Sequence, residues 1–391
     1  MNSTFLNFLT LLLFKHRNRH LAILIIATLL LALLSSVLFI SSSINSDIKT
    51  VLKEQSDFTL QRFYGGKQVD MPQSWQYDIE EIAGVDKVTP RVYGTYYIAP
   101  GQEHFLIVGV DFFDAQSSNF LKTITDNLNL KEFLQKDSMY ISNGIKKFLK
   151  ERYYEEYFEF RLRDGSIKKV AIADTFSNQS NIISNDMIIM PIDLAREILG
   201  VNQEYLTDLS FNVPNEAEWD NIKTKLHLMH FDIRVLTRND ISTAYQNLFN
   251  YKGGIFLVLF LITTITFMLI LYQRYFMVYS SEKKEIGIMR AVGWSINDIL
   301  KLKFFETLIL ILFSYALGIL IAYIYVFILN APLLQNIFLG SANLSNSVTF
   351  APAINMGVLS SLFLLFAVPF MAAVLIPVWR VAIIEPKEAM K

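Results

Sequence analysis

The chain has 391 residues, of which 52% are hydrophobic and only 18% are charged, and its formal net charge is −1. It contains no cysteine, which excludes a fold held together by disulfide bonds. The apolar excess indicates a membrane protein, and the absence of net positive charge argues against binding to nucleic acid.

Four long runs without a charged residue predict four membrane-spanning helices. The first run has 20 residues, enough to cross a hydrocarbon core of ~30 Å at ~1.5 Å per residue. It is longer than the apolar part of a signal peptide, so we interpret it as an uncleaved anchor. A shorter run before it, Phe5–Phe14, is predicted to be a helix in the membrane interface. The four spanning runs are Leu21–Ile40, Ile255–Tyr272, Thr307–Leu329 and Ala353–Trp379.

The distribution of lysine and arginine predicts the orientation of these spans. Basic residues precede the first span, cluster between the second and third spans, and follow the fourth, whereas residues 330–352 carry no charge. Because basic loops stay on the cytoplasmic side, both termini and residues 280–303 are expected in the cytoplasm. The chain is then expected to be a multi-pass membrane protein with residues 45–250 outside the cytoplasm.

Residues 45–250 are predicted to form an α+β extracytoplasmic domain. They contain 22 basic and 30 acidic residues, and this acidic balance also argues against nucleic-acid binding. Apolar residues alternate in the predicted strands and recur at helical spacing in the predicted helices. They form two strand–helix–strand patterns, at 57–98 and 206–236. These two patterns flank a less regular insertion at roughly 112–203. The predicted fold class is therefore four transmembrane α-helices with a large α+β domain between spans one and two.

These patterns divide the chain into eight segments. They are an interfacial helix with span one (1–44), the extracytoplasmic domain with stalk helices (45–250), span two (251–279), a cytoplasmic segment (280–303), span three (304–329), an uncharged outer loop (330–352), span four (353–379) and a cytoplasmic tail (380–391).

The segment EKKEIGIMRAVGW, residues 282–294, shows the residue spacing of a helix, although a short loop between two spans needs only a few polar residues. Ile286, Met289 and Val292 recur at helical spacing and give an apolar stripe, and Gly293 stands where a helix would end. The residues from Ser295 predict the capped start of another helix. The pattern alone leaves two interpretations, an amphipathic interfacial helix or a helix that docks on a partner.

This segment resembles the cytoplasmic segment of the FtsX-like permeases of the MacB and LolC/LolE type. Three further stretches are similar to this family: LIVGVD at 106–111, FFETLILILFSYALGILIAY at 304–323, and the ending PVWRVAIIEPKEAMK at 377–391. The ending departs from the Pro-Ala-Arg-Arg-Ala run that is common in the family, since it lacks one basic residue.

The resemblance implies a mechanotransmitting ABC transporter permease in the bacterial inner (cytoplasmic) membrane. Such a subunit forms a homodimer, or a heterodimer with a related permease, and binds a cytoplasmic ABC ATPase and a periplasmic or outer-membrane partner. Its cargo would be a lipoprotein, a lipid or a periplasmic compound. The residues implied in coupling to the ATPase are Glu282, Lys283, Lys284, Glu285, Ile286, Gly287, Met289, Arg290 and Gly293.

The chain is expected to be a non-catalytic subunit without a cofactor. No stretch fits the Gly-x4-Gly-Lys-[Ser/Thr] loop that cradles nucleotide phosphates, so ATP would be bound and hydrolysed by a partner chain. No arrangement of a nucleophile and a base indicates a catalytic site.

Two alternative functions remain at this point. One is an FtsX-like regulator of a cell-wall hydrolase. The other is a component of a metal transport system, suggested only by His227 and His230, which are spaced to share a helix face. A surface histidine pair is the commoner explanation, so no metal site is predicted.

Two further residues stand out in span three. Glu306 lies three residues from Lys303, and an ion pair at the lipid headgroups is preferred over a mechanistic role. Gly318 with Ala322 gives a pair of small residues four positions apart, which predicts close helix packing or a bend.

Overall fold

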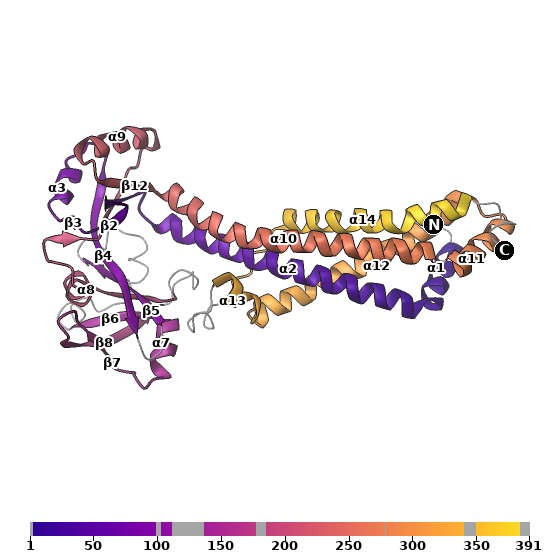
Figure 1. Cartoon of the computed structure of the whole chain (residues 1–391), viewed down its shortest axis with the longest axis horizontal. Coiled ribbons are helices and arrows are strands. Elements are labelled where there is room, and N and C mark those ends of the chain that lie inside the picture. The colour runs from indigo at the N-terminus through magenta and orange to yellow at the C-terminus, as the bar shows by residue number, and fades with distance from the viewer. Residues whose placement is uncertain are drawn as a thin grey trace. The chain divides into compact units, whose positions relative to one another are not determined.

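The computed structural model describes residues 3–98, 103–111, 137–176, 185–277, 279–339 and 349–383. The chain divides into two compact units (Figure 1). The first, called the helical unit here, contains Met1–Ser43, Asn250–Ala331 and Pro352–Lys391. The second, called the sheet unit, contains Ile44–Phe249 and Pro332–Ala351.

The sheet unit is built around one mixed ten-stranded sheet. Its strand order is β12-β1-β11-β4-β5-β9-β6-β8-β7, and β2 pairs with β1 off this path. A separate two-stranded sheet joins β3 (Met71–Pro72) to β10 (Tyr205–Leu206). The strands of the large sheet are β1 (Phe58–Tyr64), β2 (Lys67–Val69), β4 (Asp86–Ile98), β5 (Glu103–Val110), β6 (Ser138–Ser142), β7 (Tyr157–Arg161), β8 (Ile167–Phe176), β9 (Met187–Pro191), β11 (Asp208–Asn212) and β12 (Ile233–Thr237).

The two predicted strand–helix–strand patterns interleave in this sheet. The first is β1, α3 (Trp75–Glu80) and β4, and the second is β11, α9 (Trp219–Met229) and β12. Their strands pair antiparallel in the order β12-β1-β11-β4. This is the split β-α-β arrangement, in which neither pattern forms a sheet alone.

The predicted insertion extends the same sheet. Strand β5 pairs antiparallel with β4 and parallel with β9, which links the two halves. Two helices belong to this second half, α7 (Asn143–Lys150) and α8 (Ile192–Leu199). Residues 112–136 and 177–184 of the predicted insertion lie outside the described residues.

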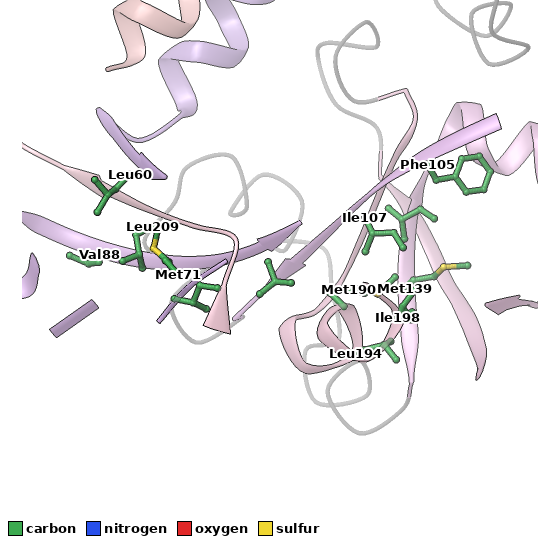
Figure 2. Packing of buried hydrophobic residues seen from close by; sticks show 14 of the residues in the cluster. Leu60, Met71, Val88, Phe105, Ile107, Met139, Met190, Leu194, Ile198 and Leu209 are labelled. Carbon is green, nitrogen blue, oxygen red and sulfur yellow. The ribbon is translucent and has the colours of Figure 1, made fainter. Parts of the chain in front are cut away.

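Apolar side chains from both halves of the sheet form one buried cluster. Figure 2 shows Leu60, Val88 and Leu209 in one group, and Phe105 and Ile107 in another. Glycine 109 of β5 allows α8 to approach closely, because a side chain at that position would overlap Ala195. The sheet unit is therefore a single α+β body with a continuous core.

The helical unit contains the helices that can cross a membrane. Four helices of the described chain are long and apolar enough, over Arg17–Thr50, Arg238–Gln273, Ile296–Ile328 and Met356–Ile383. The sheet strands fall between the first two of these, as the predicted fold class requires, so that fold class is confirmed. The helices are α1 (Ser3–Lys15), α2 (Arg17–Glu54), α10 (Arg238–Met277), α11 (Tyr279–Ala291), α12 (Ile296–Tyr323, continued by a π-helical turn over Ile324–Ile328), α13 (Leu334–Leu339) and α14 (Met356–Ile383). Of these, α13, the end of α2 from Ile44 and the start of α10 up to Phe249 belong to the sheet unit.

Helices α2 and α12 are in close contact inside the helical unit. A Cβ atom added at Gly318 would lie 2.8 Å from Leu31 Cβ and 3.3 Å from the Thr28 carbonyl oxygen. Both Gly318 and Ala322 are buried, and α12 continues through them to Tyr323. The small residues therefore serve close helix packing, the first of the two predicted explanations.

Candidate functional site

Helices α11 and α12 meet at a defined corner. Helix α11 ends at Ala291, and Gly293 has a φ of 102°, which favours glycine. The Trp294 amide donates a hydrogen bond to the Met289 carbonyl at 3.0 Å, and this closes the last turn of α11. Ser295 and Asp298 then form a reciprocal capping box at the start of α12. The predicted helix, glycine stop and second helix are confirmed.

The apolar stripe predicted on α11 does not face a single environment. Ile286 is only 3% exposed and packs against Ile299 of α12 and Val378 of α14. Val292 is 76% exposed. Ile286 therefore holds α11 against its own bundle, and its side chain is not available to a partner.

Two large apolar side chains at this end of α11 are exposed, Ile288 within the helix and Val292 in the turn that follows it. Ile288 is 55% exposed and was not among the predicted residues. Ile288 was missed because helical spacing identifies the face of a helix with the most regular apolar pattern, and in α11 that face is the buried one. The other predicted residues are placed as follows: Gly287 is buried, Met289 and Arg290 are half-buried, and Lys284 and Gly293 are exposed. Glu282 and Lys283 belong to α11, but their side chains lie outside the described residues.

Glu285 ties α11 to the start of the chain. Its carboxylate pairs with Lys15 at the end of α1 and lies 3.6 Å from His16 Nε2. Burial raises the pKa of the Glu285 carboxyl, but the hydrogen bond and the charge of Lys15 outweigh it and hold the pKa below its usual value. Burial also lowers the pKa of His16, against the opposing pull of Glu285. Helix α11 is therefore anchored by an ion pair as well as by its apolar face.

A groove of about 430 Å³ separates α1 from α11. Its charged lining residues are Lys15 and Glu285, and the remaining walls are apolar. Such an exposed apolar groove beside charged groups is the kind of surface that binds another protein. The residues that line it are Phe8, Leu11, Leu12, Lys15, Glu285, Ile288, Met289, Val292 and Trp294.

Glu306 pairs with Lys303 as predicted, but the pair is not at a solvated surface. Lys303 Nζ lies 2.8 Å from Glu306 Oε2, and the two side chains are 4% and 2% exposed. His20 Nε2 of α2 lies 3.1 Å from the other carboxylate oxygen. The predicted ion pair is therefore present, but it is part of a buried cluster of three groups between α2 and α12.

His227 and His230 of the sheet unit do not share a helix face. Helix α9 ends at Met229, and His230 follows it with an extended backbone. The His230 ring stacks on Trp75 with 3.8 Å between ring centroids, and its Nε2 lies 3.6 Å from Asp78. Among the described residues, no group of three or more His, Cys, Asp or Glu side chains is placed to hold a metal ion.

The described chain thus combines four candidate membrane spans, a helix with one buried and one exposed apolar side, and an α+β unit whose strands fall between the first two spans. Residues 255–386 match the family model of the FtsX-like permease C-terminal domain. The match includes α11 and α12, and it confirms the predicted resemblance over this part of the chain.

Two solved structures are similar to the chain at low identity. One is the periplasmic region of MacB from Actinobacillus actinomycetemcomitans, with 11% identity, a TM-score of 0.32, and coverage of 51% of this chain and 98% of that one. The other is the extracellular domain of the noncanonic ABC-type transporter YknZ from Gram-positive bacteria, with 9% identity, a TM-score of 0.29, and coverage of 46% and 99%. A comparison with curated proteins gave no match.

Proposed function

We propose that the chain is the permease subunit of an ABC transporter and that a cytoplasmic ABC ATPase docks on α11. The observation that carries this proposal is the helix within the matched permease domain that is fixed on one face and exposed on the other. Ile288 and Val292 supply apolar surface for an interface, and Lys284 is an exposed charge near them on the same helix.

The anchoring of α11 suits it to transmit movement. Ile286 connects it to α12 and α14, and Glu285 connects it to the corner between α1 and α2. A partner that pulls on Ile288 and Val292 therefore moves three membrane helices together, because packed elements shift as bodies.

Helix α2 offers a route from this corner to the sheet unit. It is one uninterrupted helix from Arg17 to Glu54, and strand β1 begins four residues later at Phe58. In this proposal, ATP hydrolysis in the partner changes the conformation of the extracytoplasmic domain. The cargo is a lipoprotein, a lipid or a periplasmic compound, the permease acts as a homodimer or heterodimer, and both of its termini are cytoplasmic.

The proposal is tested by the double substitution Ile288→Asp and Val292→Asp. Both side chains are exposed, so the full-length chain keeps its fold while the apolar contact with the ATPase is lost. Co-purification of the ATPase and permease-stimulated ATP hydrolysis are measured in detergent, and both are expected to fall to background.

The matched control is Phe231→Asp, which places the same charge on an exposed apolar residue of the sheet unit. It should leave co-purification unchanged. An ATPase that still co-purifies with the Ile288→Asp, Val292→Asp chain would overturn docking on α11.

A further inference from the structure

A second apolar groove lies between α12 and α14, within the helical unit. Its volume is about 460 Å³, in the ~300–1,000 Å³ range of small-molecule sites. Helix α12 supplies one wall and helix α14 supplies the other. The lining residues are Leu300, Lys301, Phe304, Leu375, Ile376 and Trp379.

The surface of this groove is almost entirely carbon, with one cation at it. Lys301 is exposed, and within the part of the chain that the structure describes no carboxylate lies at salt-bridge distance from its ammonium group. The Asp298 carboxylate accepts hydrogen bonds from the backbone amide and the hydroxyl of Ser295 at the start of α12. The Lys301 charge is therefore available to an anion.

Aromatic and basic groups mark the same end of α14. Trp379 is half-exposed in the groove, and the adjacent Arg380 donates a hydrogen bond to the Tyr272 hydroxyl at 3.4 Å. Tryptophan and basic residues gather where a spanning helix leaves the hydrocarbon layer. The groove therefore runs along two candidate membrane spans and has its cation at the end of the apolar region.

We propose that this groove binds an anionic phospholipid. One acyl chain lies along Phe304, Leu375 and Ile376, and the phosphate group pairs with Lys301. Basic pockets between membrane helices bind acidic lipid headgroups. The cation attracts the phosphate group, and the apolar wall contacts the acyl chain.

This inference does not depend on ATPase docking and is tested on the full chain alone. The chain is reconstituted in vesicles of phosphatidylcholine that contain an equal small fraction of brominated phosphatidylglycerol or brominated phosphatidylcholine. Bromine quenches tryptophan at short range, and the difference between the native chain and Trp379→Phe isolates the signal of Trp379. Brominated phosphatidylglycerol is expected to quench this signal more strongly.

The deciding variant is Lys301→Gln, which should lower the preference for phosphatidylglycerol about fivefold, the factor for one lysine at ~1 kcal/mol. The control Arg17→Gln removes another exposed cation of the helical unit and should keep the preference. Equal quenching by the two lipids, or a preference that survives Lys301→Gln, would overturn the proposal. The chain lacks cysteine, so Trp379→Cys introduces a single thiol in the groove. A disulfide between two copies of this variant would show that the groove is a protein interface and would also overturn the proposal.

Discussion

His20 Nε2 lies 3.1 Å from Glu306 Oε1, and this contact joins α2 to α12 inside the helical unit. The other oxygen of the same carboxylate is paired with Lys303 at 2.8 Å. All three side chains are buried. One carboxylate thus connects the helix that leads to the sheet unit with the helix that follows the proposed docking segment.

Glu306→Ala is expected to destabilise the chain by about 3–5 kcal/mol, because it leaves the Lys303 ammonium buried without its partner. The double substitution Glu306→Leu with Lys303→Met should recover much of this loss, since it replaces both charges by apolar groups. Unfolding of the detergent-purified chain, followed by denaturant titration, measures both effects. A double variant no more stable than Glu306→Ala would contradict a coupled pair.

Gly318→Ala is expected to destabilise the contact between α2 and α12. The added Cβ would lie 2.8 Å from Leu31 Cβ, and overpacking of this kind costs about 1–3 kcal/mol. Gly254→Ala in α10 is the matched control, because an added Cβ there meets nothing within 4 Å. By helix propensity it should be neutral or stabilise by up to ~1 kcal/mol. Thermal unfolding of the two variants should therefore shift in different directions, and equal shifts would speak against close packing at Gly318.

The pair between Lys15 and Glu285 predicts a dependence of stability on pH. The folded pKa of Glu285 is below its usual value, so its contribution is present above ~pH 4.3 and is lost as the pH falls through the folded pKa. Lys15 is 61% exposed, so solvent screening limits the contribution to about 0.5 kcal/mol. Glu285→Gln and Lys15→Gln should each reduce the difference in stability between pH 7 and pH 3. An unchanged difference in both variants would contradict the pairing.

The proposed orientation is checked by single cysteines in this cysteine-free chain. Val292→Cys, in the turn after α11, should react with a membrane-impermeant maleimide only after inside-out vesicles are prepared. Tyr64→Cys at the end of β1 should react in intact spheroplasts. Both positions are well exposed, so accessibility within the protein does not decide the result. The reverse pattern would place α11 outside the cytoplasm and rule out docking of a cytoplasmic ATPase.

Much of the architecture was predictable from local pattern. Span length, the positions of basic residues and the strand–helix–strand periodicity depend on composition over short windows, and those features identified the four helices and the α+β class. The corner at Gly293 was also predictable, because a glycine stop and a Ser-x-x-Asp cap are properties of neighbouring residues.

The roles of individual side chains were less predictable. The stripe from Ile286 to Val292 was expected to face a partner, but its most regular member packs inside. Periodicity shows that a helix has an apolar face, yet it does not show whether that face meets the same chain or another one. His20 was not singled out at all, because its contact with Glu306 crosses 286 residues of sequence.

The sequence by itself determined the four apolar helices and the α+β class of the domain between the first two, since both follow from short-range hydrophobic patterns. Only the tertiary structure decided which residues of α11 are free, that the insertion extends the main sheet through β5 and β9, and that Glu306 is buried between two helices. These are long-range pairings. Their energy depends on which surfaces pack together in the folded chain, and the pattern of neighbouring residues does not predict this.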